Sequence, residues 1–296
     1  MKDPKPFPIK NEVEFNKFLV REYLKYASVD EVFRIHKYSL PVSYANYQRI
    51  LDKWGIVKAA GPNSKFSEMV NFLAKMVKEE IPLEKLYKKT PHSFRTSVVT
   101  LYRILSYVRE GITRRVGTAL VITPESEENL ILIAKDMSTP RLDFGKPYGS
   151  FTIPMGFSSK VDTRNDAVLR VLQQEVFTNE TIEKEFPSSV IPKKLEPFMY
   201  LDVLDVRVAI YHLVLPKKYS SISGFSSFKL QDFKFVKLDR ILNKKESLNY
   251  RFGLENALLG YKTCLDFKRR KLSFNPLQAK SELNRELVVT VDFPRE

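Results

Sequence analysis

The stretch PMGFSSKVDTRNDAVLRVLQQEV, from Pro154 to Val176, decides how the rest of the chain is interpreted. Its second half, NDAVLRVLQQEVF, has the apolar spacing of a helix within a region otherwise rich in strands. Positions 171, 174 and 175 project from one face of such a helix, because they are spaced i, i+3 and i+4. They hold Val171, Gln174 and Glu175, so this face carries a single carboxylate.

Runs of β-branched and aliphatic residues surround this helix and predict strands. VGTALVIT and NLILIAKD, separated by the acidic turn PESEEN, predict a hairpin. Two more strands are predicted in Phe198–Pro216 and another in Phe233–Leu242, followed by a helix around Ser247–Leu259. We therefore predict an α/β (α+β) domain of mixed type at residues 114–265.

The Pro154–Val176 stretch resembles the Nudix box, G-x5-E-x7-R-E-U-x-E-E-x-G-U, in which U is aliphatic. The matching positions are Gly156, Asp162 in place of Glu, Arg170, Leu172 and Glu175. The departures are Val171, Gln174 and Phe177, and in FTIPMGF Met155 replaces a glycine. The resemblance covers about half the chain and implies a Nudix-like α/β/α sandwich with a mixed sheet.

The family that this stretch resembles uses helix carboxylates to hold Mg²⁺ or Mn²⁺ against a diphosphate, because hard cations need oxygen ligands. Val171 offers no oxygen and Gln174 only a neutral amide oxygen, so the residual box positions are Asp162, Arg170, Gln174 and Glu175. Glu175 is either a residual metal ligand or a surface acid paired with Arg170, and we favour the second interpretation. Further carboxylates would have to come from elsewhere, and the candidates are Asp202, Asp205, Glu183 and Glu185.

The N-terminal third is predicted to be helical. Val13–Ala27 has an apolar face, Ser28 and Glu31 predict a capping box, and Val42–Val57 places Tyr47, Ile50, Leu51 and Trp54 on one side. Two helices joined by the turn YSLP, with KAAGPNSKF as a wing, give the outline of a winged helix-turn-helix.

A second segment, Pro82–Arg115, repeats this outline at an offset of 54 residues, which pairs Ser43 with Ser97. The alternative is two ordinary amphipathic helices with a shared pattern. If the repeat is real, the outward side chains suit phosphates and base edges. The candidates for nucleic-acid contact are Ser43, Tyr44, Asn46, Arg49, Lys53, Arg95, Thr96, Arg103, Arg114 and Arg115.

Charge supports this assignment. Residues 1–115 contain 22 Lys and Arg against 12 Asp and Glu, so they carry +10 of the chain's net charge of +14. Such an excess attracts a phosphate backbone, although a solubilising surface is the alternative. The single Cys264 cannot form an internal disulfide, and no apolar run has the length of a membrane helix, so we expect a cytoplasmic protein.

These observations predict three parts: tandem helix-turn-helix-like units at 1–113, a Nudix-like domain at 114–265 and a basic extension at 266–296 with a short strand. The leading hypothesis is a DNA-binding regulator whose degenerate Nudix-like domain senses an anionic nucleotide-type ligand beside Gly156 and Glu175, or forms a homodimer. An active Nudix hydrolase that uses Mg²⁺ or Mn²⁺ on a nucleoside-diphosphate derivative is the first alternative. A protein-interaction module is the second.

Overall fold

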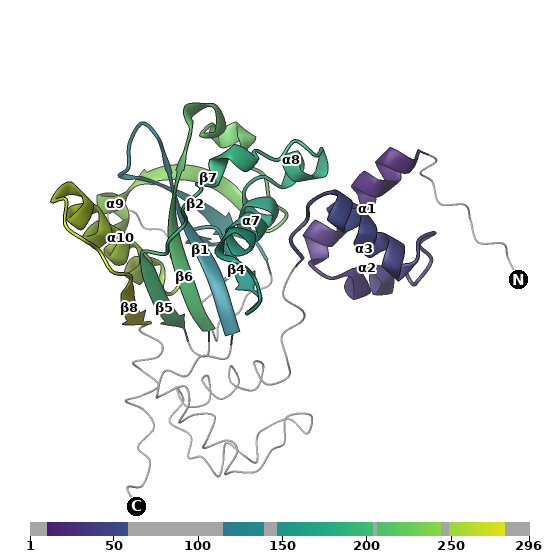
Figure 1. Cartoon of the computed structure of the whole chain (residues 1–296), viewed down its shortest axis with the longest axis horizontal. Helices are drawn as coiled ribbons and strands as arrows, with labels where there is room; N and C mark the ends of the chain where they lie inside the picture. The colour runs from purple at the N-terminus through teal and green to yellow at the C-terminus, as the bar shows by residue number, and fades with distance from the viewer. Residues whose placement is uncertain (1–10, 59–114, 139–146, 204–205, 244–248, 282–296) are drawn as a thin grey trace, which may run out of the picture.

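The computed structural model of the chain describes residues 11–58, 115–138, 147–203, 206–243 and 249–281. In Figure 1 these residues form a unit of three helices and a larger α/β domain. The proposed second helix-turn-helix copy lies outside the described residues, except for Arg115. The expected wing after Lys58 and the expected strand ELVVTVDF lie outside them as well.

The N-terminal helices form where the sequence predicts them. They are α1 (Glu12–Tyr26), α2 (Val29–Ile35) and α3 (Tyr44–Lys53). Ser28 caps α2, since its Oγ accepts a hydrogen bond from the Glu31 amide at 3.3 Å, and Ser43 caps α3 in the same way. The predicted apolar face of α3 is internal: Tyr47, Ile50 and Leu51 are buried. The Tyr47 hydroxyl donates a 2.6 Å hydrogen bond to the Leu19 carbonyl and so joins α3 to α1.

Two sheets form the larger domain. The five-stranded mixed sheet has the order β4-β1-β6-β5-β8, and the three-stranded antiparallel sheet has the order β3-β2-β7. In the first sheet β1 pairs parallel with β6 and antiparallel with β4. The strands are β1 (Arg115–Pro124), β2 (Leu130–Asp136), β3 (Ser150–Thr152), β4 (Met155–Ser158), β5 (Met199–Val203), β6 (Val206–Leu215), β7 (Leu230–Lys237) and β8 (Leu277–Lys280).

The predicted hairpin of β1 and β2 is wrong, because the two strands belong to different sheets. Both faces of β1 are buried: Ala119 and Val121 join one core cluster, and Leu120 and Ile122 join another. A strand covered on both faces lies inside the domain. The acidic turn therefore connects two layers.

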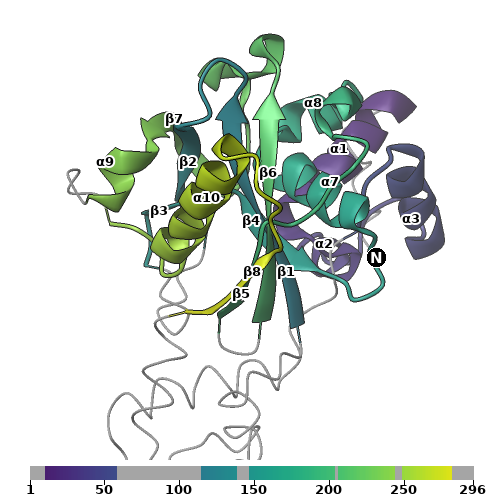
Figure 2. The ribbon, with the colours of Figure 1, turned by 60° about the vertical axis from the view of Figure 1, so that its left-hand side comes forward.

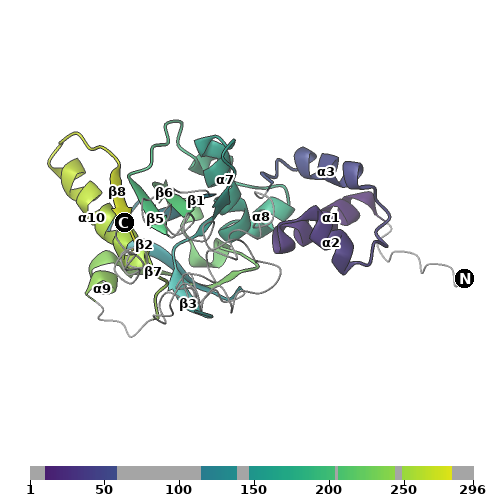
Figure 3. The same cartoon turned by 90° about the horizontal axis from the view of Figure 1, so that it is seen from below.

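Helices cover the sheets from opposite sides. On one side lie α7 (Arg164–Glu175) and α8 (Thr178–Ile182), and on the other α10 (Leu254–Arg269) (Figure 2). The short α9 (Leu238–Leu242) follows β7 directly. Seen from below, α1–α3 lie beyond α7 and α8, so the layers run from α10 through the sheets to the N-terminal helices (Figure 3). This arrangement is the α/β/α sandwich with a mixed sheet that the resemblance implies.

The C-terminal region differs from the expectation. Helix α10 begins at Leu254, after Gly253 with φ +83°, and runs past the proposed boundary at 265, since Leu258, Tyr261 and Leu265 continue its buried face. Its last turn includes the first residues of the basic extension predicted at 266–296. Strand β8 then pairs parallel with β5, so residues 277–280 complete the sheet of the preceding domain.

Candidate functional site

Helix α7 carries the box residues and begins with a reciprocal cap. The Thr163 side chain accepts from the Asp166 amide, and the Asp166 carboxylate accepts from the Thr163 amide. Val171 packs in the core with Leu120 and Leu172, so the second box carboxylate is replaced by a core side chain. Gln174 and Glu175 end the helix, and both are more than nine-tenths buried.

Arg170 is a structural residue of this domain. Its guanidinium is 3% exposed and donates to both oxygens of Asp162, with the Nη2 to Oδ1 bond at 2.8 Å. The favoured interpretation, in which Glu175 is a surface acid paired with Arg170, is therefore wrong. Asp162 uses its carboxylate to hold Arg170, because the loop before α7 brings the two together.

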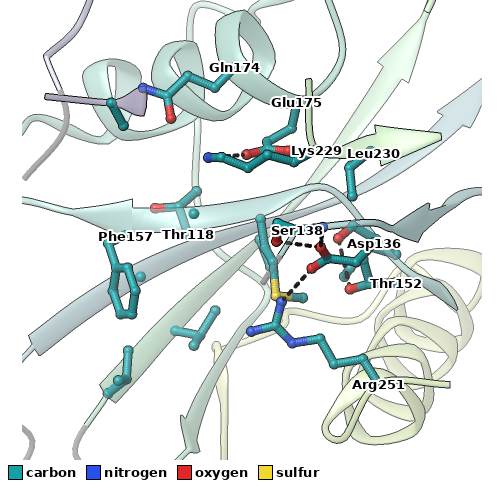
Figure 4. A pocket seen from close by; sticks show the side chains of 18 of the residues that line it. Thr118, Asp136, Ser138, Thr152, Phe157, Gln174, Glu175, Lys229, Leu230 and Arg251 are labelled. Atoms are coloured by element: carbon teal, nitrogen blue, oxygen red, sulfur yellow. Dashed lines mark hydrogen bonds and ion pairs between the residues drawn. The ribbon is translucent and has the colours of Figure 1, made fainter. Parts of the chain in front are cut away.

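Glu175 is paired with a lysine that the sequence did not single out. Its Oε1 accepts a 3.0 Å hydrogen bond from Lys229 Nζ, and Figure 4 shows the two side chains side by side below α7. Burial raises the pKa of Glu175, and the Lys229 charge opposes that shift. The negative charge of Glu175 raises the pKa of Lys229, so the ammonium form is favoured.

Ser227 fastens the lysine segment to the end of α7. Its hydroxyl lies 3.0 Å from the Gln174 carbonyl and 3.3 Å from Glu175 Oε2, and it accepts from the Lys229 amide at 3.1 Å. On the other side, the Met137 amide donates to the Lys229 carbonyl at 2.8 Å. The Lys229 backbone is thus held from both α7 and β2.

A cavity of about 820 Å³ opens beside this pair. Its wall combines the sheets, the end of α7, the start of α10 and the α1–α2 region, including Arg34 and Tyr38. Gly156 and Glu175, the two residues expected beside a ligand pocket, both line it. Much of the remaining wall is aliphatic, so one part of the cavity is apolar and one end is polar, as in many small-molecule sites.

Asp136 forms the second polar centre of the cavity. Its Oδ1 accepts hydrogen bonds from the Ser138 amide and hydroxyl, and Arg251 Nη1 lies 3.5 Å from its Oδ2 (Figure 4). Asp136 is 5% exposed and comes from the end of β2, whereas Arg251 precedes α10. The sequence gives no spacing signal for this pair, because it joins residues far apart in the chain.

The described residues do not fit the divalent metal that the Nudix resemblance implies. Within the ranges described, no group of three His, Cys, Asp or Glu side chains is placed to hold a metal ion. The Lys229 ammonium lies against Glu175, and a second cation there would be repelled. Thus the suggested metal ligand is already neutralised by a side chain of the protein.

The other proposed carboxylate donors have different surroundings. Asp202 forms a two-bond ion pair with Arg207 between β5 and β6, at 2.8 and 3.0 Å. Glu183 accepts from Lys17 of α1 at 2.6 Å, and Glu185 is exposed. Asp205 lies outside the described residues. None of the three described acids lines the cavity.

The segment after α3 is hydrogen-bonded to α7. Gln173 donates from Nε2 to the Gly55 carbonyl at 2.8 Å and accepts at Oε1 from the Val57 amide at 3.0 Å. Arg170 Nε donates to the Lys58 carbonyl at 2.8 Å. The same helix therefore faces the cavity with its last two residues and holds the N-terminal unit with Arg170 and Gln173.

The nucleic-acid candidates on α3 are exposed, with Asn46, Arg49 and Lys53 on one side of the helix and Tyr44 on another, where its ring stacks on Phe33. Ser43 is exposed as well, although its hydroxyl caps the helix. Arg115 instead begins β1, and its guanidinium lies over the Phe157 ring at 5.0 Å. The other candidates, Arg95, Thr96, Arg103 and Arg114, lie outside the described residues.

Comparisons with known proteins were made for the whole chain. No family model and no curated protein matches it. Among solved structures it is similar to a NUDIX hydrolase from Nitrosomonas europaea, at 16% identity over 57% of this chain and 80% of the other, with a TM-score of 0.38. It is also similar to a mutT/nudix family protein from Listeria innocua, at 17% identity over 54% of this chain and 98% of the other, with a TM-score of 0.37. An ADP-ribose pyrophosphatase from Streptococcus suis is similar at 14% identity over 56% of this chain and 99% of the other, with a TM-score of 0.36.

The mixed sheet, the helices on both sides and the box residues on α7 agree with the arrangement that the resemblance implies. The larger domain has a Nudix-like fold. At these identities and TM-scores the likeness says nothing about the ligand or the chemistry of this chain. In the part of the chain that the structure describes, no helix has the length and apolar character needed to cross a bilayer.

Proposed function

We propose that this protein is a ligand-responsive regulator whose Nudix-like domain binds a nucleotide-type small molecule without metal-dependent hydrolysis. One observation carries the proposal: Lys229 lies 3.0 Å from Glu175 at the polar end of a cavity of about 820 Å³. The cavity has the size of a small-molecule site, and its apolar wall suits a nucleobase. The lysine removes the charge that a catalytic metal would need.

The experiment is a thermal-shift screen of the full chain with nucleotides and sugar nucleotides, each with Mg²⁺ and with a chelator. A ligand that binds only the folded state raises the melting temperature as its site fills. The same mixtures are assayed for released phosphate and for cleaved nucleotide. Stabilisation without cleavage supports the proposal. If no compound shifts the melting temperature, the domain is a scaffold.

Nucleic-acid binding by the N-terminal unit is the second half of the proposal. The observation that supports it is the exposed face of α3 with Asn46, Arg49 and Lys53, and the exposed Tyr44 beside it, in a region of positive net charge. The test is binding of the full chain to duplex DNA and to RNA at several salt concentrations. Loss of affinity with salt, weakened in Arg49→Ala and unchanged in the α10 control Lys262→Ala, supports the proposal. No binding at low salt contradicts it.

An active hydrolase is the second candidate function. The structural neighbours reported above are named as hydrolases, and the observation on this chain that favours the candidate is the second buried carboxylate, Asp136, which lines the same cavity as Glu175. The assay is metal-dependent cleavage of a panel that includes ADP-ribose, with Mg²⁺ and Mn²⁺. Turnover by the unmodified protein that Glu175→Gln abolishes establishes the hydrolase and rejects the non-hydrolytic proposal.

A further inference from the structure

The charges around Glu175 are balanced without a divalent ion. The box pattern places three carboxylates at positions 171, 174 and 175, and this chain keeps one of them. Lys229 supplies one positive charge at 3.0 Å from the one remaining negative charge. The loss of two acids and the presence of one lysine are therefore consistent with each other, because the lysine supplies the positive charge beside Glu175.

Lys229 has capacity to bind a further group. An ammonium carries three N–H donors, and within the described residues Glu175 accepts from one of them. The Lys229 side chain is 32% exposed although protein atoms surround it, because its accessible surface lies on the cavity. The anchoring of its backbone by Ser227 and Met137 holds the ammonium in place before a ligand arrives.

The balance of charge also limits the ligand. Three cationic side chains line the described part of the cavity, and each is in an ion pair: Lys229 with Glu175, Arg251 with Asp136 and Arg34 with Glu31. Asp30 adds a further negative charge to the wall. A diphosphate or triphosphate would bring more negative charge than a monophosphate to a cavity whose described wall has no excess positive charge. One oxyanion can share the Lys229 ammonium with Glu175.

Gln174 is a second indication of a polar ligand at this end. Its amide is more than nine-tenths buried at the cavity wall, and its Nε2 atom has no hydrogen-bond partner among the described residues. A buried amide donor without an acceptor is costly, and a bound acceptor group is one way to satisfy it. In Figure 4 its nitrogen points away from Lys229, so its acceptor would be a part of the ligand other than the group bound at Lys229.

We propose that Lys229 replaces the divalent metal of this site and directly binds the single phosphate of a nucleoside monophosphate whose base occupies the apolar part of the cavity, while Gln174 donates to another acceptor of the same ligand. This inference rests on the proposed function, because it names the ligand class and the contact within the same cavity. It predicts that the phosphate group contributes to affinity equally with Mg²⁺ and with a chelator.

The experiment measures binding to the full chain by titration calorimetry. The probes are inorganic phosphate, the four common nucleoside monophosphates and the matching nucleosides. The variants are Lys229→Met, which removes the charge but keeps the length, Lys229→Arg, which keeps the charge, and Lys237→Met, a control at the exposed last residue of β7. The double variant Lys229→Met, Glu175→Gln leaves no unpaired charge, so it serves if the single variant does not fold.

In the wild type we expect a monophosphate to bind more tightly than its nucleoside, with or without Mg²⁺. Lys229→Met should weaken monophosphate binding about tenfold to a hundredfold, as expected for a charge-assisted hydrogen bond, and leave nucleoside binding unchanged. Lys229→Arg should retain part of the preference, and Lys237→Met all of it.

The two levels of the proposal fail in different ways. A monophosphate preference that persists in Lys229→Met, or that requires Mg²⁺, overturns the role of Lys229 while ligand binding in the cavity stands. A wild type that binds nucleosides and monophosphates equally also overturns it. If none of these probes binds the wild type, the role of Lys229 is rejected, and failure of the wider nucleotide and sugar-nucleotide screen as well rejects the proposed function.

Discussion

Arg170 and Asp162 show what a box residue does here at the scale of single side chains. Arg170 is 3% exposed and makes hydrogen bonds to Asp162 and to the Lys58 carbonyl, so its charge is satisfied entirely by groups of the protein. Removal of one partner from a buried ion pair leaves the other charge uncompensated, which costs more than the loss of an exposed pair. These two residues therefore stabilise the domain whatever its activity.

Asp162→Asn should lower the free energy of unfolding by about 3 kcal/mol, because it leaves the Arg170 guanidinium buried without a counter-charge. Urea unfolding of the full chain measures the change. Asp239→Asn is the matched control, since Asp239 is exposed and pairs with Lys262 at the surface. We expect the control to change stability by less than about 1 kcal/mol. Equal effects of the two substitutions would show that Arg170 is not held by Asp162.

His212 gives the molecule a pH dependence. Burial lowers the pKa of His212 to about 4, and its Nε2 atom lies 2.9 Å from Thr123 Oγ1 and 3.0 Å from Tyr261 Oη. In the unfolded chain His212 binds a proton near pH 6.5, whereas in the folded chain His212 does so only near pH 4. The contribution of neutral His212 to stability is therefore complete above pH 6.5 and is lost as the pH falls from 6.5 toward 4.

This loss should reach at most about 3 kcal/mol, from the shift in pKa. Urea unfolding of the wild type and of His212→Gln between pH 7.5 and pH 4.5 measures it. The quantity compared is the change with pH and not the absolute stability, because the variant also loses packing. The wild type should lose more stability than the variant over this interval. Parallel pH profiles would rule out a neutral buried His212 as the cause.

The spacing within one helix could be predicted from sequence, but the partners from other segments could not. Gly156, Asp162, Arg170 and Glu175 follow from a local pattern. Lys229 lies 54 residues from Glu175, in the segment directly before β7, and two further strands, β5 and β6, lie between them in the chain, so no spacing rule identifies it. The sequence therefore indicates a weakened metal site and leaves out the lysine that neutralises it.

At the scale of elements, periodicity predicts helices and strands well where burial is one-sided. Helices α1 and α3 have clear apolar faces, and Ser28 caps α2 as the sequence predicts. Strand β1 is buried on both faces, so its sequence does not show which strand it pairs with, and the expected hairpin was wrong. The start of α10 was misplaced because a glycine, with a backbone conformation set by tertiary contacts, determines it.

Substitutions at Gly253 and Gly55 test how much such a glycine contributes to the stability of the fold. Both have positive φ, at +83° and +66°. A Cβ at Gly253 would lie 3.2 Å from Leu201 Cδ2, whereas a Cβ at Gly55 would meet no atom within 4 Å. Gly55→Ala should cost about 1 kcal/mol from the backbone conformation alone, and Gly253→Ala should cost more. Thermal unfolding of both variants measures the difference. A larger cost for Gly55→Ala would contradict the close contact at Leu201.

At the scale of the whole molecule, α7 connects the cavity to the N-terminal unit. Gln174 and Glu175 face the cavity, and Gln173 and Arg170 bind the segment 55–58 that follows α3. Trp54 Nε1 also donates to the Ile182 carbonyl of α8 at 3.1 Å, and Ile182 packs into the core of the three N-terminal helices. The α1–α2 region lines the cavity as well, so a ligand would touch both units.

We expect ligand binding to slow hydrogen exchange in α1–α3 as well as around Lys229, because a ligand that contacts both units stabilises their junction. Gln173→Ala should reduce the protection of α3 and leave that of the α1–α2 region, since it removes both hydrogen bonds to Gly55 and Val57 but no residue of the cavity. Hydrogen exchange of the full chain, with and without a ligand found in the thermal-shift screen, measures the protection. Gln278→Ala, at an exposed position on β8, is the control. If the ligand protects only the Nudix-like domain in the wild type, the N-terminal helices do not respond to the cavity, and a regulatory link through α7 is excluded.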